Sequence, residues 1–417
     1  MLNCLVIGSG ISGLSTALAL RKAGHAATVY EAYPEPSDGV GGFLTLAVNG
    51  FDALDTLGLK DAARRLGFST PRMSMYLGST GRHLADFDYG GTLADGTTAR
   101  TMTRSELYAL LRNEAVERGA RIVYGKRLQA VEEAPDGVTA RFDDGTAASG
   151  HLLVGADGLR SAVRPLIAPS SPEPRSIPLL NTGGIVPAGL GPALDVEQGR
   201  MKMVFGKRCF YCYMPDPDGR IWWFANPLQR SSGNPAERDA PALKGWLMGL
   251  VSGDRTPMAR IIEATDAVIT PYMTYDFPTI PSWHRGRMVL VGDAAHAASP
   301  SSGQGASMAI EDAVTLGSGL LGVGAEGITP ALARYESERR GRAEAVVEWG
   351  RRNAAPKIRG QFQRVFQDLA LRAVFRSLSR GAADSFDWVY GHHIPWGPAR
   401  GDARGEAANG EVAASPN

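Results

Sequence analysis

Residues 3–31 read NCLVIGSGISGLSTALALRKAGHAATVYE and decide the fold. A short apolar strand at residues 3–7 runs into three closely spaced glycines, and the apolar-periodic helix that follows ends at Gly24. A second strand at residues 27–31 completes a β-α-β unit of about 30 residues. This unit predicts a parallel α/β domain of the dinucleotide-binding type.

The glycines of the first turn have a physical purpose. Gly8, Gly10 and Gly13 allow a tight turn, a close approach to a pyrophosphate and packing of the helix on the strand. The helix N-terminus offers free N–H groups and positive potential to the phosphates. Glycine turns are common, but Glu31 ends the second strand where it can accept hydrogen bonds from ribose hydroxyls. An acid here fits the unphosphorylated adenosine ribose of FAD or NAD.

A second segment separates these two cofactors. In residues 287–313, RMVLVGDAAHAASPSSGQGASMAIEDA, an apolar strand ends in Gly292-Asp293, and a glycine-rich loop opens into a helix near Gly305. Asp293 can bind ribityl hydroxyls. The helix directs its dipole at the pyrimidine edge of a flavin, where reduced flavin carries negative charge. NAD has neither a ribityl chain nor that anion, so the segment predicts a flavin.

The remaining patterns describe two kinds of sheet. A further strand ends in Asp157-Gly158, and Thr103 with Glu106 forms a capping box at the start of a helix. Alternation over residues 128–148 predicts an antiparallel meander. Beyond Pro165 we expect aromatic-rich antiparallel strands at 201–205, 210–214 and 221–225, and helices at 242–251, 305–321, 329–352 and 357–378.

Composition narrows the class of protein. The chain has 417 residues and a net charge of +1, so it has no basic field for binding nucleic acid. Three cysteines exclude a disulfide framework and indicate a reducing compartment. Cys209 and Cys212 form a lone C-x-x-C within a strand, which we interpret as two packed thiols, and no metal site is expected. No apolar run reaches the ~20 residues that span a bilayer, and no leader is visible, so we expect a cytoplasmic protein.

Together, the three glycines with Glu31, the Asp157-Gly158 motif and the 287–313 segment resemble the single-component FAD-dependent aromatic monooxygenases. This is the group A class typified by para-hydroxybenzoate hydroxylase, and the resemblance covers roughly residues 2–395. It implies an α/β fold with an α+β second domain: a Rossmann-like FAD-binding domain, a β-sheet substrate-binding domain and C-terminal helices. The expected boundaries are 1–72 with 99–175 and 268–355 for FAD, 73–98 with 176–267 for substrate, 356–397 for a helical segment and 398–417 for a disordered tail.

The resemblance also implies roles for particular residues. Arg104 contacts FAD, Asp157 lies near the pyrophosphate and serves the nicotinamide donor, and Asp293 binds the ribityl or pyrophosphate region. Pro300 lies against the isoalloxazine beside the substrate. The implied cofactor-binding residues are Gly8, Gly10, Ile11, Ser12, Gly13, Glu31, Arg104, Leu128, Asp157, Gly158, Gly292, Asp293, Pro300, Gly303, Gly305, Ala306 and Ser307.

By the same resemblance the aromatic-rich sheet covers the flavin ring and binds the substrate. On a two-residue period only half of its aromatic side chains can face the flavin. His296 invites a catalytic role, although a structural histidine bonded to backbone also explains it. The candidate substrate-binding residues are Phe43, Phe205, Tyr211, Tyr213, Trp222 and Phe224, and the candidate catalytic residues are Pro300, His296, Tyr211 and Tyr213.

The implied reaction is a monooxygenation. NADH or NADPH reduces noncovalently bound FAD, O2 forms the flavin C4a-hydroperoxide, and the distal oxygen attacks an aromatic or polycyclic substrate, conceivably in secondary metabolism. Epoxidation and Baeyer–Villiger oxidation fit the same motifs. A halogenase would carry Trp-x-Trp-x-Ile-Pro, which residues 222–227 do not match, and a non-catalytic flavin-binding protein is the remaining alternative. The sequence leaves open a monomer or a homodimer.

Two positions depart from the family pattern. Ser307 stands where the glycine-rich loop usually continues with Asn, so contacts to the flavin edge are expected to differ. Residues 39–43 lack the arginine that some members carry there, so we expect no clamp for a substrate carboxylate at that point.

Overall fold

The computed structural model describes the chain except residues 40, 191–193, 195, 230–234, 358–385 and 398–417. The predicted helix at 357–378, apart from its first residue, lies outside the described residues. So do the predicted tail at 398–417 and most of the predicted helical segment at 356–397.

The β-α-β unit expected at the N-terminus is the centre of a six-stranded sheet. Strand β1 pairs in parallel with β2 on one side and β12 on the other, with Leu5 opposite Thr28 and Leu153. Its residues Cys4 to Ile7 are all buried, as in a parallel sheet covered on both faces. The strand order is β18 (His284–Arg285), β19 (Met288–Leu290), β12 (Leu152–Gly155), β1 (Asn3–Ile7), β2 (Ala26–Tyr30) and β8 (Arg121–Val123).

The helices of this part begin and end close to the predicted positions. Helix α4 starts with the predicted capping box: Thr103 Oγ1 accepts from the Glu106 backbone N–H at 3.1 Å, and the Glu106 carboxylate accepts from the Thr103 N–H at 2.7 Å. Helix α9 packs between α1 and α10. The helices are α1 (Ile11–Lys22), α2 (Val48–Thr56), α3 (Lys60–Ala63), α4 (Arg104–Glu117), α5 (Arg164–Ile167), α8 (Asp293–His296), α9 (Gly305–Gly319), α10 (Ile328–Ala354) and α12 (Asp387–Tyr390), with 3-10 turns η3 (Pro300–Ser302), η4 (Ala325–Gly327) and η5 (Ala355–Lys357).

Two small antiparallel sheets flank the central one. The predicted meander is confirmed as β9 (Leu128–Ala134), β10 (Gly137–Phe142) and β11 (Ala147–Gly150). The second small sheet has the order β3 (Phe43–Leu46), β7 (Arg100–Thr103) and β4 (Phe68–Ser69).

A seven-stranded sheet contains the predicted aromatic-rich strands. They form its middle and pair antiparallel, while β14 pairs in parallel with β5. The order is β17 (Tyr272–Asp276), β13 (Arg175–Val186), β16 (Ile221–Pro227), β15 (Cys209–Pro215), β14 (Arg200–Phe205), β5 (Arg72–Leu77) and β6 (Arg82–Asp88). Helices α6 (Ala240–Val251) and α7 (Met258–Glu263) and the turn η2 (Pro235–Glu237) follow β16.

The two faces of this sheet pack against different neighbours. Tyr211, Tyr213 and Trp223 form one cluster with apolar residues of α6 and α7, and we call this the outer face. Cys212, Met214 and Trp222 belong to a cluster on the other side, which we call the inner face. Because Cys209 joins the outer cluster and Cys212 the inner one, the C-x-x-C thiols point to opposite faces, and both are buried and outside any disulfide. The interpretation as two packed thiols is confirmed.

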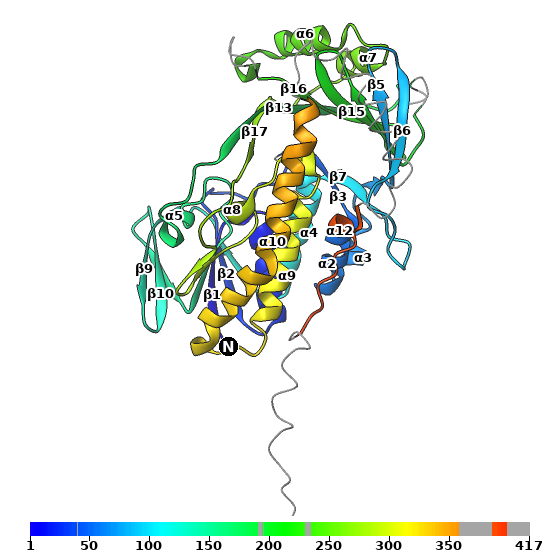
Figure 1. The fold of residues 1–417 in the computed structure, drawn as a ribbon. Coiled ribbons are helices and arrows are strands. Elements are labelled where there is room, and N and C mark those ends of the chain that lie inside the picture. Colours follow the sequence, from blue (N-terminus) through cyan, green and yellow to red (C-terminus); the bar gives the residue numbers. More distant parts are fainter. Residues whose placement is uncertain (40, 191–193, 195, 230–234, 358–385, 398–417) are drawn as a thin grey trace, which may run out of the picture.

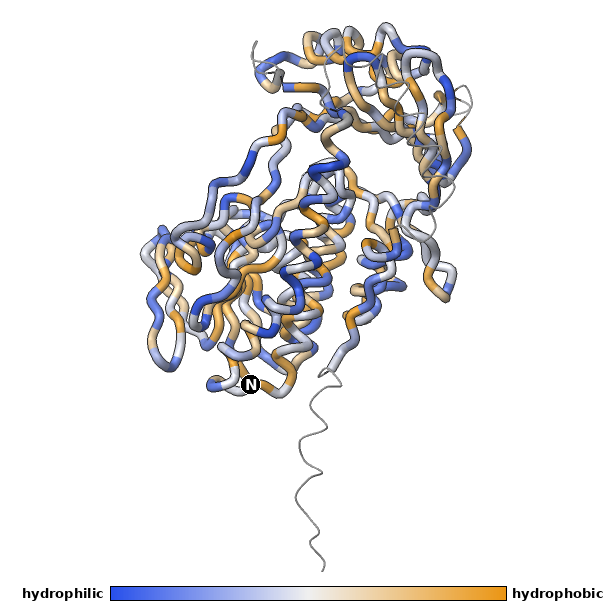
Figure 2. The backbone as a smooth tube through the Cα atoms, in the orientation of Figure 1, coloured by the Kyte–Doolittle hydropathy of each residue, from blue (hydrophilic) through white to orange (hydrophobic). Residues whose placement is uncertain are grey.

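The layers are clear in Figure 1. Helices α6 and α7 cover the far side of the seven-stranded sheet, and the end of α10 reaches that sheet from below. Figure 2 shows hydrophobic residues concentrated in the interior of the lower part, where β1, α1 and α9 supply core residues such as Leu5, Leu14 and Val314. Within the described part of the chain, no helix combines the length and the apolar character that crossing a membrane requires.

Candidate active site

Three predicted motifs meet at the carboxyl ends of adjacent strands β19, β12 and β1. Gly8 has φ +100°, and a Cβ there would lie 2.6 Å from the Ala156 carbonyl oxygen. Gly292 has φ +59°, and its Cβ would lie 2.6 Å from Ser12 Oγ. Neighbouring backbone at Gly8 and the Ser12 side chain at Gly292 leave too little space for a Cβ, and both residues have a positive φ, which explains glycine at both positions. The glycine turn, the Asp157-Gly158 motif and the Gly292-Asp293 motif form one site.

The N-terminus of α1 is open toward this site. Its N-cap residue, Gly10, supplies no side-chain cap, so the first N–H groups of the helix are available to a ligand. A Cβ at Gly10 would meet nothing within 4 Å, which leaves room for a phosphate. Ile11 is half-buried, and the buried Ser12 Oγ has no hydrogen-bond partner. These features fit a pyrophosphate.

Glu31 is tied to the same turn. Its Oε2 accepts from the backbone N–H and from the hydroxyl of Ser9, both at 2.8 Å, and its Oε1 accepts from the Tyr33 N–H at 3.0 Å. The carboxylate thus fixes the glycine turn from the end of β2. An ionised carboxylate accepts about four hydrogen bonds, so acceptor capacity remains for a ribose hydroxyl.

Only one of the two carboxylate oxygens of Asp157 has hydrogen-bond partners. Its Oδ2 accepts from the backbone N–H groups of Ala162 at 2.7 Å and Val163 at 3.2 Å. Its Oδ1 is buried and has no partner. Desolvation raises the pKa of Asp157, against the lowering effect of these hydrogen bonds. A free buried acceptor beside Gly158, which has φ +73°, is a position where a ligand donor would be favourable.

Asp293 and Arg104 converge from different elements. Asp293 is the first residue of α8, and its side chain is exposed although protein atoms surround it closely enough for desolvation to raise its pKa. The positive charges of His296 and Arg104 oppose that rise. Arg104 begins α4, and its Cδ would lie 3.2 Å from a Cβ placed on Gly41. An acid that keeps solvent access while protein atoms surround it is suited to accept hydrogen bonds from a polyhydroxyl chain.

The glycine-rich loop leads into a second uncapped helix. Pro300 is exposed at the start of η3. Gly303 has φ +63°, and a Cβ placed on it would lie 2.4 Å from the Tyr89 hydroxyl oxygen. The α9 N-cap supplies no side-chain cap, and a Cβ at Gly305 would meet nothing within 4 Å. The first N–H groups of α9 therefore have no side-chain cap, and the helix N-terminus can stabilise an anion that comes close to it.

The residues that follow Gly305 turn away from that space. Ala306 is half-buried, whereas Ser307 is 1% exposed and faces α2, where its Oγ lies 2.6 Å from a Cβ placed on Gly50. The Ser307 hydroxyl has no hydrogen-bond partner. Leu128, another predicted contact, begins β9 and lies in the core opposite Phe142.

A buried ionic network supports α9 from behind. Glu311 and Asp312 are fully buried, and Arg339 of α10 donates to Glu311 Oε2 at 2.7 Å and to Asp312 Oδ1 at 2.9 Å. Asn49 of α2 donates to Gln304 at 2.8 Å and to Glu311 at 2.7 Å. The network fixes α2, α9 and α10 relative to one another and so holds the N-terminus of α9 in place.

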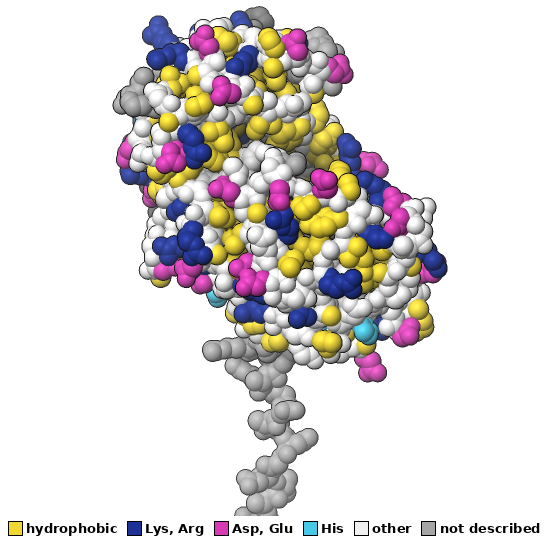
Figure 3. Space-filling model, turned by 180° about the vertical axis from the view of Figure 1, so that it is seen from behind, with side chains coloured by type: hydrophobic (Ala, Val, Ile, Leu, Met, Phe, Trp, Pro, Cys, Tyr) yellow, Lys and Arg dark blue, Asp and Glu magenta, His cyan; other side chains and the backbone are white. Residues whose placement is uncertain are grey.

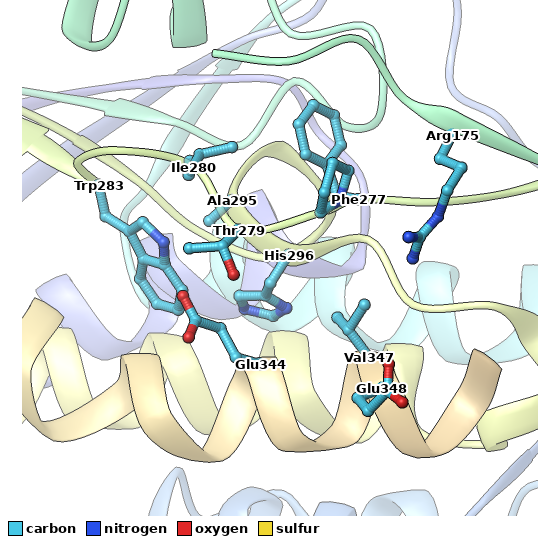
Figure 4. Close-up of a pocket in the computed structure, with 11 residues that line it drawn as sticks. Arg175, Phe277, Thr279, Ile280, Trp283, Ala295, His296, Glu344, Val347 and Glu348 are labelled. Atoms are coloured by element: carbon cyan, nitrogen blue, oxygen red, sulfur yellow. The ribbon is translucent and has the colours of Figure 1, made fainter. Parts of the chain in front are cut away.

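His296 belongs to this network. Its Nε2 lies 2.5 Å from Asp312 Oδ2, which also accepts from the Gly292 N–H at 2.8 Å. Figure 4 shows the ring near Trp283 and facing α10, where it lines a cavity of about 210 Å³. None of the other residues predicted to bind cofactor or substrate lines this cavity, so we do not assign it to the site. The geometry gives His296 a support role behind Gly292-Asp293.

The inner face of the seven-stranded sheet brings together four of the six predicted substrate residues. Phe43 packs edge-on against Trp222 at 5.3 Å and lies 6.3 Å from Phe224, while Phe205 packs on Phe210, which in turn lies 6.3 Å from Phe224. Figure 3 shows hydrophobic side chains gathered at the hollow between the upper sheet and the lower part of the molecule.

Tyr211 and Tyr213 are not brought to this face. Both belong to the outer cluster, and the Tyr211 hydroxyl bonds Thr256 at 2.6 Å and Asp254 at 3.2 Å. Burial and the nearby Asp254 raise the pKa of Tyr211, so it stays protonated. The structure places neither tyrosine where it could touch a substrate on the inner face.

Three residues at the inner face were missed from the sequence: Phe210, Asn226 and Lys357. Asn226 lies two residues after Phe224 on β16 and so shares its face, whereas Phe210 joins that face only through the register in which it pairs with Asn226. No local sequence pattern indicates that Lys357 lies at the inner face, because its hydrogen-bond partners Ser301 and Asn226 are 56 and 131 residues away in the chain.

Comparison with known proteins agrees with this geometry. A family model described as an FAD binding domain matches residues 1–350. An FAD-dependent urate hydroxylase from Klebsiella pneumoniae is 34% identical over 352 residues, covering 83% of this chain and 88% of the relative. Aurachin C monooxygenase/isomerase from Stigmatella aurantiaca is 31% identical over 388 residues, covering 92% of this chain and 96% of the relative.

Solved structures show the same architecture. The Klebsiella pneumoniae enzyme HpxO, complexed with FAD and uric acid, superposes with a TM-score of 0.78 at 28% identity, covering 91% of this chain and 96% of HpxO. The family match extends over the open helix N-termini and the acids described above. The chain therefore belongs to the FAD-binding-domain family and is a flavoprotein of the monooxygenase type.

Proposed function

We propose that this protein is an NAD(P)H-dependent monooxygenase that hydroxylates an aromatic or polycyclic substrate. The proposal is carried by the segment that contains the acid Asp293, exposed Pro300 and the uncapped α9 N-terminus, together with its link to the inner face through Lys357, which bonds both Ser301 and Asn226. Bound FAD supplies a hydride acceptor for NAD(P)H and activates O2 at its C4a position. Relatives that act on urate, aurachin C and 3-amino-4-hydroxybenzoate support a ring-shaped, electron-rich substrate.

Different residues of the chain would bind different parts of FAD and the substrate. The open N-terminus of α1 would hold the pyrophosphate, with Glu31 on the adenosine ribose and Asp157 nearby. Arg104 and Asp293 would orient the ribityl chain. The N–H groups of α9 would stabilise negative charge at the flavin's pyrimidine edge. The inner face would stack the substrate and exclude water, which protects a reactive oxygen species from side reactions.

The test is a substrate panel with FAD-loaded protein. Urate, 3-amino-4-hydroxybenzoate and a series of naphthols and quinolones are offered with NADH or NADPH in air, and nucleotide oxidation, hydrogen peroxide and product mass are measured. The proposal expects at least one aromatic to accelerate nucleotide oxidation and to gain one oxygen atom. A ring-expanded or epoxide product of the same mass would indicate Baeyer–Villiger oxidation or epoxidation. Hydrogen peroxide as the only product with every aromatic would refute oxygenation of this substrate class.

The cellular setting is also a proposal. Cys4, Cys209 and Cys212 form no disulfide, which supports a reducing compartment, and we propose the cytoplasm.

A further inference from the structure

Lys357 joins the two walls of the proposed substrate site. It ends η5, directly after the part of α10 that reaches the seven-stranded sheet (Figure 1). Its Nζ donates to the hydroxyl of Ser301, the neighbour of Pro300, at 3.1 Å and to Asn226 Oδ1 on β16 at 3.2 Å. The same Nζ lies 4.1 Å from the ring centroid of Phe210 on the inner face.

No carboxylate among the described residues balances the charge of this ammonium. Within the described part of the chain, Lys357 forms no salt bridge, and both of its hydrogen-bond partners are neutral oxygens. An ammonium has three donors, so one of them has no acceptor here. Desolvation lowers the pKa of Lys357 to about 8, as expected for a cation placed among apolar rings without a counter-charge. Lys357 is half-buried, and a partly desolvated cation without a counter-charge is stabilised when an anion binds beside it.

We propose that Lys357 binds an anionic oxygen of the aromatic substrate, while the ring of that substrate lies on the inner face beside Phe210 and Phe224. The inference rests on the proposed function, because it concerns the same site. It gives the substrate class a chemical mark: an aromatic ring with an ionised phenol or a carboxylate. It also supplies the anion contact that the arginine-free segment 39–43 does not.

The test compares binding of three matched probes to the oxidised, FAD-loaded protein. They are 2-naphthoate, 2-naphthol and the neutral 2-naphthamide, and binding is followed through the flavin difference spectrum. Lys357→Met keeps the length of the side chain but removes its charge, and Lys357→Arg keeps the charge. Lys202→Met is the matched control, since Lys202 also lies over an aromatic ring, that of Tyr76 at 5.3 Å. Its position in β14 is opposite Tyr213, which belongs to the outer face.

Lys357→Met is expected to lower the affinity for the preferred anionic probe by about tenfold or more, because one charge-assisted hydrogen bond is lost. Binding of 2-naphthamide should stay within about twofold, and Lys357→Arg should restore much of the anion affinity. Weakening confined to 2-naphthoate identifies a carboxylate. Weakening of 2-naphthol, together with loss of its naphtholate absorbance in the complex, identifies a phenolate.

The inference would be overturned if Lys357→Met lost affinity equally for all three probes, or for none of them. It would also be overturned if the wild-type protein bound 2-naphthamide more tightly than the two other probes. The FAD content of each variant reports whether it has folded. Because the assay needs neither reduction nor O2, its outcome is independent of whether the protein oxygenates anything.

Discussion

At the scale of single residues, the glycines of the first turn have different tasks. A Cβ on Gly13 would lie 1.9 Å from the Gly8 carbonyl oxygen, so Gly13 is required by the fold itself. Gly10 has φ −68° and open space around its Cβ position, so the fold tolerates a side chain there. The open space at Gly10 is where the cofactor's pyrophosphate would come close to the backbone. Fold and cofactor binding can therefore be separated at two positions only three residues apart.

We predict that Gly13→Ala destabilises the apoprotein by about 3 kcal/mol or more, because the added methyl group must displace backbone. Gly10→Ala should leave apoprotein stability unchanged but weaken FAD binding by at least about tenfold, or roughly 1.4 kcal/mol. Urea unfolding of the apoprotein and titration with FAD measure the two effects. If Gly10→Ala bound FAD as well as the wild type does, the pyrophosphate would not lie against this turn.

At the scale of elements, α9 is held by charges that the core would otherwise exclude. Arg339 has a side chain 2% exposed and pairs with two fully buried carboxylates, Glu311 and Asp312. Arg342 also pairs with Glu311, and His296 also pairs with Asp312. Removing one partner of such a network leaves two buried carboxylates with less positive charge beside them, in a place where water cannot replace it. The position of the α9 N-terminus, on which oxygen activation depends in our proposal, thus rests on residues far from the substrate.

Arg339→Met is expected to cost about 3–5 kcal/mol of unfolding free energy, the usual effect of breaking a buried ion pair. The control is Arg351→Met on the same helix, since Arg351 pairs with Glu348 at the surface. That variant should unfold at the same urea concentration as the wild type. Equal stability of the two variants would show that the network contributes nothing to the fold.

The pair of His296 and Asp312 makes stability depend on pH. Desolvation lowers the pKa of His296, but the Asp312 carboxylate outweighs it, so the folded pKa lies above the ordinary value of about 6.5. A raised histidine pKa stabilises the fold fully below about pH 6.5, and this contribution is lost as pH rises through the folded pKa. Desolvation raises the pKa of Asp312, yet His296 and Arg339 lower it to about 2, so that contribution is lost only in acid.

We therefore predict that the unfolding free energy of the wild type falls as pH rises from 6 to 9, and that His296→Gln removes this fall. His393→Gln is the control, because that ring is 64% exposed and pairs with Asp52 at the surface. Urea unfolding at each pH measures the slope. An unchanged slope in His296→Gln would assign the pH dependence to other groups.

At the scale of the whole molecule, local patterns were readable from the sequence and distant contacts were not. The β-α-β unit, the capping box at Thr103 and the meander depend on residues close in the chain, and each is confirmed. Period-two alternation separated Tyr211 from Phe210, but only packing against α6 and α7 shows which set faces outward. The division into an FAD-binding and a substrate-binding domain stays a prediction.

The contacts that could not be foreseen join segments far apart in the chain. Asn49 meets Glu311 across 262 positions and Lys357 meets Asn226 across 131, and no local pattern marks either pair. The sequence therefore indicated the cofactor more fully than the substrate, since the cofactor loops follow strand ends while the substrate site is assembled between a sheet and a helix end.

Oxygen labelling tests the central claim most directly. FAD-loaded protein is given NAD(P)H, isotopically labelled O2 and the aromatic that most accelerates nucleotide oxidation, and the product is examined by mass spectrometry. The account predicts that each product molecule carries one labelled oxygen atom and that its formation consumes one molecule of NAD(P)H. A product that carries oxygen from water, or an unmodified aromatic with all of the label in hydrogen peroxide, would contradict it.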